Sequence, residues 1–191
     1  MGKIKIWLLL PMIVLLVGCG KETAGEVEQA MAFRSTLLEA DGCSFTGKIT
    51  ADYGNNVWEF TVDCHADGEG NLSFEVVEPE PIAGITGTVE AQGGKLTFDD
   101  KALGFGLLAE NRISPVSCPY MVARSWCTGF ISAAGYDDSG LRMTVETTFE
   151  ERPLTVDTWL DQEKGVPIFS EVCYNRERIL WISISEFEFD T

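Results

Sequence analysis

The sequence predicts a mainly β domain of the α+β class, in which a strongly curved antiparallel sheet has its hollow covered by two helices. Nine short runs have strand character and are separated by clusters of Gly, Asn and Asp. Two other segments carry apolar residues at helical spacing. Two helices beside this many strands do not form a closed sandwich, and they are suited to cover the hollow of a curved sheet.

An export signal precedes the domain. Met1, Lys3 and Lys5 form a short basic region, and residues 6–17 form an apolar run that is shorter than the ~20 residues of a membrane-spanning helix. The run ends in small residues, as a processing site does. We therefore interpret residues 1–18 as a signal peptide.

The Leu-Val-Gly-Cys sequence that ends at Cys19 resembles a lipobox, where bacterial lipoprotein processing attaches diacylglycerol to the cysteine and cleaves before it. We expect acyl chains such as palmitate on Cys19, a short tether over residues 19–24, and a single domain over residues 25–191. Two or three acyl chains would hold the protein at the extracytoplasmic face of the cell membrane. A plain signal peptide with an incidental cysteine is the alternative.

The first helix is expected over residues 25–39. Thr23 and Glu26 have the spacing of a capping box, and Gly42 follows as a helix stop. Apolar residues recur between them at helical spacing and would turn inward: Val27, Ala30, Met31, Phe33, Leu37 and Leu38.

Strands are expected over residues 44–53, 56–65, 71–77, 82–90, 95–98, 141–149, 154–161, 166–174 and 178–189. Several of them alternate cleanly, with Leu72, Phe74 and Val76 separated by Ser73 and Glu75. One face of the sheet is therefore buried. Closely spaced neighbours must pair antiparallel, because a parallel connection needs a dozen or more residues.

A second helix is expected to interrupt the strands between residues 110 and 135. Ser114 followed by Pro115 predicts a helix cap and a first-turn proline. The helix would end near Gly129 or Gly135, after a series of residues at helical spacing: Val116, Tyr120, Ala123, Trp126, Cys127 and Phe130.

The chain is strongly acidic. Its formal net charge of −16 becomes −18 when the leader, which carries two lysines, is removed. Nucleic acid is thereby disfavoured as a partner, because its phosphates require basic groups. Anionic lipid would also repel this body, so we expect acyl chains, rather than a basic patch, to provide membrane attachment.

Five cysteines follow the anchor, and an exported domain meets an oxidising compartment in which they can pair. The hairpin spacing favours a Cys43–Cys64 bridge. Cys118 and Cys127 cannot bridge each other if both lie in one helix, so one of them is expected to meet Cys173 and the other to stay free. The alternative is that all five are reduced, small buried residues.

No motif for catalysis, a metal or a cofactor stands out, and we do not expect an enzyme. His65 is the only histidine and would have to be the base of any Ser-His-Asp set. Strand alternation places it with Asp63 on the solvent side, opposite Phe60 and Cys64. The cysteines lack the close spacing of a zinc or redox site, and no glycine-rich segment has the pattern of a phosphate-binding loop.

Two parts of the chain carry a family resemblance. Residues 72–85 indicate a strand, a turn with Pro79, and a second strand centred on Gly84. The second part lies near the C-terminus. It consists of residues 157–161, a run that contains Pro167, and a last strand over 179–189. This succession resembles the LolA-type lipoprotein carriers and their lipid-anchored relatives, the outer-membrane lipoprotein-sorting superfamily. The resemblance implies an unclosed barrel with an apolar cavity under a helical lid.

Two functions of different class follow. In the first, a cavity binds an acyl chain of a lipid or lipoprotein, or another hydrophobic ligand, with these lining candidates: Phe60, Phe74, Val76, Met143, Val145 and Trp181. Ordinary core packing would also explain each of them. In the second, side chains fill the hollow, and the domain is a non-catalytic interaction module of the cell envelope that presents an acidic face to a partner protein.

Overall fold

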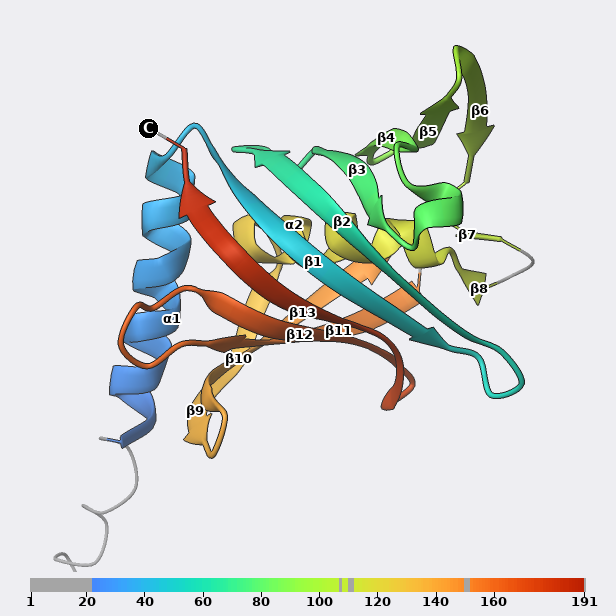
Figure 1. The fold of residues 1–191 in the computed structure, drawn as a ribbon. Coiled ribbons are helices and arrows are strands. Elements are labelled where there is room, and N and C mark those ends of the chain that lie inside the picture. The colour runs from blue at the N-terminus through green and yellow to red at the C-terminus, as the bar shows by residue number, and fades with distance from the viewer. Residues whose placement is uncertain (1–21, 107, 110–111, 150–151, 191) are drawn as a thin grey trace, which may run out of the picture.

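The computed structural model describes residues 22–106, 108–109, 112–149 and 152–190. The predicted signal peptide, Cys19 and most of the tether lie outside these residues. Within them, the chain forms one large sheet, two α-helices and a small two-stranded hairpin of β7 (Leu108–Ala109) and β8 (Arg112–Ile113) (Figure 1).

The large sheet has eleven strands in the order β6-β5-β4-β3-β2-β1-β13-β12-β11-β10-β9, and every neighbouring pair is antiparallel. Its edge strands, β6 and β9, do not pair with each other in the described part of the chain, so the curved sheet stays open. The expected fold class is confirmed. The strands are β1 (Gly42–Asp52), β2 (Val57–Asp67), β3 (Leu72–Glu78), β4 (Thr86–Glu90), β5 (Gly93–Phe98), β6 (Lys101–Phe105), β9 (Phe130–Asp137), β10 (Gly140–Phe149), β11 (Arg152–Leu160), β12 (Pro167–Tyr174) and β13 (Glu177–Phe189).

Helix α2 (Cys118–Cys127) lies in the hollow of the sheet, where it contacts strands of both halves, among them β2, β3, β11 and β12 (Figure 1). Eight of its residues are buried. Trp126 is fully buried, and its ring centroid lies 5.4 Å from that of Phe45 and 5.8 Å from that of Phe187. The helix therefore fills the hollow with side chains.

Helix α1 (Glu22–Glu39) stands at the side of the sheet and packs mainly against β9 (Figure 1). Its predicted apolar stripe is only half correct. Ala30, Phe33 and Leu37 are buried, but the others remain partly exposed: Val27, Met31 and Leu38. At the rim of the sheet only a narrow side of the helix meets the core.

A buried chain of hydrogen bonds ties α2 to the sheet. Trp126 donates its Nε1–H to Thr158 Oγ1 at 3.1 Å, and that hydroxyl lies 2.8 Å from Ser170 Oγ. All three side chains have an exposed fraction of 0%. Because buried polar groups are costly when unpaired, these bonds favour one position of the helix over β11 and β12.

Arg34 of α1 caps the C-terminal end of α2. Its guanidinium donates hydrogen bonds to four backbone oxygens, at 2.8 Å to Trp126, 3.0 Å to Ser125 and Gly129, and 3.3 Å to Thr128. Carbonyls in the last turn of a helix have no partner within the helix, and a cation there also complements the helix dipole. Arg34 thus joins both helices to the start of β9.

Some elements differ from those predicted from the sequence. The second helix is shorter than expected, because a 3-10 turn (Pro115–Ser117) precedes it and Gly129, with φ of +90°, ends it. Ser114 precedes that turn, yet its side chain makes no cap hydrogen bond. The predicted strand over 82–90 begins only at Thr86. A 3-10 turn (Glu80–Ile82) occupies its start, next to prolines that cannot donate to a sheet.

We expect Arg34→Met to lower the free energy of unfolding by about 2–4 kcal/mol, since it removes charged donors to four carbonyls. Denaturant titration measures this. Arg178→Met is the control, because Arg178 forms an exposed pair with Glu171 at 2.6 Å, which is worth less than about 1 kcal/mol. Equal losses in the two variants would contradict the capping role.

Candidate functional site

The structure brings five of the six predicted lining residues into the core. Phe60, Phe74 and Val76 lie on the inner face of β2 and β3, and Met143 and Val145 lie on the inner face of β10. Met143 and Val145 have an exposed fraction of 0%, so no water-sized void adjoins them. These side chains pack the core in this conformation.

Trp181 does not join them. It lies between the inward-facing residues Leu180 and Ile182 of β13, so its side chain is on the outer face of the sheet. The guanidinium carbon of Arg178 lies 4.3 Å from the centroid of its ring. Trp181 therefore cannot line an inner cavity, and the prediction that it does so is wrong. Strand alternation turns its side chain to the outer face.

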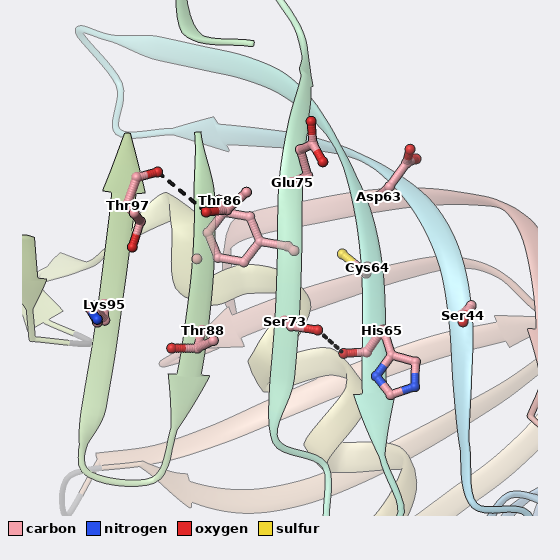
Figure 2. A pocket seen from close by; sticks show the side chains of 12 residues that line it. Ser44, Asp63, Cys64, His65, Ser73, Glu75, Thr86, Thr88, Lys95 and Thr97 are labelled. Atoms are coloured by element: carbon pink, nitrogen blue, oxygen red, sulfur yellow. Dashed lines mark hydrogen bonds between the residues drawn. The ribbon is translucent and has the colours of Figure 1, made fainter. Parts of the chain in front are cut away.

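An open hollow lies instead on the outer face, opposite the helices. It extends over β1 to β5 and has a volume of ≈ 540 Å³. Figure 2 shows its side chains projecting from adjacent strands, most of them polar. We call it the outer groove and define it by its outward-facing lining residues: Ser44, Asp63, His65, Ser73, Glu75, Thr86, Thr88, Lys95 and Thr97; Cys64, Phe74 and Gly87 lie between them along β2, β3 and β4.

Strand register arranges the polar residues of the outer groove in two rows. In the first row each residue pairs with the next on the adjacent strand: Ser44, His65, Ser73, Thr88 and Lys95. The second row pairs in the same way and begins beside the groove at Thr46, from which it continues through these lining residues: Asp63, Glu75, Thr86 and Thr97. Successive outward residues of a strand lie ~7 Å apart, and four strand spacings span ~19 Å. The groove is therefore an ordered polar surface.

Charge is distributed unevenly along these rows. Asp63 and Glu75 place two carboxylates on β2 and β3, while Lys95 places an ammonium group on β5 (Figure 2). Thr46 donates to Asp63 Oδ1 at 2.7 Å. Among the described residues, Glu75, Thr88 and Lys95 have no side-chain hydrogen bond or ion pair. Their polar atoms are available to a partner.

His65 and Ser44 share one carboxylate at the end of the first row. His65 Nε2 lies 2.8 Å from Asp190 Oδ2, and Ser44 donates to Asp190 Oδ1 at 3.3 Å. A nucleophilic triad needs the histidine between the serine and the acid. Here the acid lies between them, so His65 is not placed to take the proton of Ser44. This contact fixes the C-terminal end of β13 to β1 and β2.

The described residues contain no group of three or more His, Cys, Asp or Glu side chains placed to hold a metal ion. Similarly, no helix within those residues is long and apolar enough to cross a membrane.

The predicted disulfides are absent, and all five described cysteines are free thiols. Cys43 pairs with Ala66 and Cys64 with Phe45, so Cys43 and Cys64 are only diagonal neighbours. Cys173 pairs with Thr155 on the neighbouring strand. Burial and the nearby carboxylates of Asp157 and Glu171 raise the pKa of its thiol. It is therefore on the outer face, across the sheet from α2, and neither Cys118 nor Cys127 can reach it.

Comparisons with known proteins concern the fold alone. No family matches the sequence, and no curated protein matches it. The structure is similar to that of a LolA superfamily protein from Nitrosomonas europaea, with 10% identity, 90% of this chain and 95% of that chain covered, and a TM-score of 0.46. It is also similar to lipoprotein LppX from Mycobacterium tuberculosis (12% identity; 85% and 93% covered; TM-score 0.40) and to LprF from Mycobacterium bovis (10%; 88% and 95%; 0.41).

No sequence motif predicts the outer groove. Its residues are the polar alternates of five strands, which resemble any solvated strand face. Only the register shows that they form two rows, and no motif encodes the register.

We expect the fully reduced protein to lose stability above about pH 9. Burial raises the pKa of the Cys43 thiol to about 12, against an ordinary value of 9.0. The folded state keeps this proton while the unfolded chain releases it, so stability present below pH 9 is lost as pH rises toward 12, by about 1.4 kcal/mol per pH unit. Denaturant titrations at pH 8 and 10 measure the loss. Cys43→Ala should reduce this loss of stability between pH 8 and 10. An unchanged loss in the variant would show that the Cys43 thiol is not its source.

Proposed function

We propose that this protein is a lipid-anchored, non-catalytic binding module of the cell envelope, which recruits a polypeptide partner in the outer groove. One observation carries the proposal: the hollow under the helices is packed with side chains, whereas the groove on the opposite face is open and polar. The acidic-face function expected from the sequence is therefore favoured over the apolar cavity.

The chemistry of the groove suits an extended polypeptide. Hydroxyls, carboxylates and an ammonium group offer both donors and acceptors at strand spacing. Basic side chains of the partner would lie near Asp63 and Glu75, and an acceptor or carboxylate would lie near Lys95. A net charge of −18 for the mature chain would also speed the approach of a basic partner.

The proposed anchor would hold this groove at the membrane surface. Helix α1 begins at Glu22, three residues after Cys19, and three residues span at most ~11 Å. The domain would therefore sit close to the bilayer, where it meets membrane-associated partners.

An apolar ligand is the second candidate, and one observation favours it. The inner-face series of β2 runs from Val62 through Phe60 to Trp58, whose side chain is 57% exposed at the strand's end. An apolar path thus leads from the surface to the core. An acyl chain could follow it only if side chains around α2 moved.

Cross-linking tests the first candidate. With a photo-reactive residue at Thr97 in cells, we expect an adduct with a partner polypeptide. Thr88→Arg should lower its yield at least tenfold, because a large cation would fill the groove. Ser183→Arg, on the outer face of β13, is the matched control and should leave the yield unchanged. A yield that Thr88→Arg does not affect would rule out this groove.

Native mass spectrometry separates the two candidates. For the unlipidated Cys19→Ala protein we expect the mass of the polypeptide alone, because the described core side chains pack against one another. A co-purifying fatty acid or phospholipid that Trp58→Ser releases would support the second candidate instead.

The anchor is tested by fractionation. We expect Cys19→Ala to move the protein from the membrane pellet to the soluble fraction, because the acyl chains are lost. Gly20→Ala leaves the thiol in place and is the control. Sedimentation of the Cys19→Ala protein with membranes after a salt wash would place the anchor elsewhere.

A further inference from the structure

Strand β6 is a free edge of the large sheet. Among the described residues it pairs with β5 alone. Figure 1 shows the β5–β6 hairpin projecting away from both helices and from the rest of the sheet. Four of the five residues of β6 are exposed, and a Cβ atom on Gly104 would meet no described atom within 4 Å. The outer edge of β6 is therefore open.

The hairpin turn determines which backbone groups of β6 are free. Its two central residues, Asp99 and Asp100, have φ of 52° and 61°, as in a two-residue type I′ turn. In such a hairpin the two residues that flank the turn exchange hydrogen bonds, and every second pair after them does the same. Between these pairs, the N–H and C=O groups of Ala102 and Gly104 point away from β5. They are the groups that an added strand would meet.

The same edge carries apolar side chains on the inner face of the sheet. Leu96 and Leu103 lie opposite each other on β5 and β6. Leu96 packs against the core, but Leu103 is 66% exposed. Phe98, at the end of β5, is 52% exposed. An apolar side chain beside unpaired backbone groups makes an edge strand ready to pair with another strand.

We propose that two copies of this protein associate through β6, with the two β6 strands antiparallel about a two-fold axis at Leu103. In this register Ala102 of each copy lies opposite Gly104 of the other, so the free backbone groups of both residues exchange hydrogen bonds. Leu103 packs against Leu103 of the second copy. The contact is the same on both copies, as a two-fold axis requires.

Other registers use less of the edge. A shift by two residues aligns either Ala102 or Gly104 with itself, and it leaves the other residue opposite the turn or beyond the end of the strand. A shift by one residue sets the free groups against groups that already pair with β5. The register centred on Leu103 pairs all the free groups. It also makes an apolar row across four strands, to which each copy contributes Leu96 and Leu103.

Charge favours a second copy at this edge. The chain has a formal net charge of −16, so two copies repel each other across most of their surfaces. Residues 93–106, which contain the hairpin, carry two Lys and two Asp and therefore have no net charge. Two acidic bodies can meet here without like-charge repulsion, whereas a basic partner would gain nothing from the hairpin itself.

The contact is small. Two strands of five residues bury less than the ~1,200 Å² of a stable protein–protein interface, so the dimer is weak in solution. It is expected at the membrane, where the proposed lipid anchors would concentrate both copies. Only this location rests on the proposed function. The pairing uses no residue of the outer groove, and fractionation of the Cys19→Ala protein tests the anchor separately.

Disulfide cross-linking tests the pairing. Leu103→Cys places two thiols at the two-fold axis, where the α-carbons would lie ~4.5 Å apart, within the range of a disulfide. When membranes that carry the full chain are treated with copper-phenanthroline, we expect a species of twice the chain's mass on a non-reducing gel. Thr97→Cys is the matched control, because its thiol on β5 would be three strand spacings, ~14 Å, from its counterpart. It should give no more dimer than the unmodified chain.

A second substitution tests the hydrogen bonds. In the Leu103→Cys chain, Ala102→Pro removes an N–H that points away from β5, and an edge strand tolerates proline at such a position. We expect it to lower the dimer yield about tenfold, because each copy loses a donor to the other. Ala102→Thr keeps the N–H and should leave the yield unchanged.

Three results would overturn the proposal: a Leu103→Cys chain that gives no more dimer than Thr97→Cys, a Leu103→Cys chain that is joined to a different polypeptide instead, or equal yields with Ala102→Pro and Ala102→Thr. The comparison of the two cysteine variants decides the matter even if Ala102→Pro fails to fold.

Discussion

The capping of α2 by Arg34 is the interaction on which the arrangement of the domain depends. A single guanidinium on α1 satisfies the last carbonyls of α2 and that of Gly129, where β9 is about to begin. Gly129 must be a glycine there, because a side chain would lie 2.7 Å from Val145. The Arg34 contact and the Trp126–Thr158–Ser170 hydrogen bonds hold α2 at two points. Because α2 is held there, its side chains fill the hollow of the sheet.

A filled inner hollow decides where binding can occur. Side chains such as Met143 have no void beside them, whereas Glu75, Thr88 and Lys95 on the outer face have polar groups that pair with no other side chain in the described part of the chain. Curvature therefore has two consequences. It gives the inner face a concave core that one helix can fill, and it leaves an open hollow on the outer face of β1 to β5.

Sequence patterns predicted where helices and strands lie in the chain better than they predicted which of these elements pack against one another. Alternation located most strands, and helical spacing located both helices, because each depends on local side-chain direction. The pairing of β1 with β13 joins residues more than a hundred positions apart, and no local pattern encodes it. Alternation put Trp181 opposite Leu180 and Ile182, but both faces of β13 are apolar and the sequence did not show which one turns inward, so Trp181 was assigned to the wrong face. Strand β6 was not predicted, because its exposed Ala and Gly residues have a low preference for strands.

Native-state hydrogen exchange of α2 in reducing buffer tests the central claim most directly, because reduction removes any disulfide that could hold the helix. If α2 is a fixed part of the core, its amide hydrogens should exchange only through global unfolding, as slowly as those of β1 and β13. Exchange of α2 through local opening, while β1 and β13 stay protected, would show a movable lid and contradict the account.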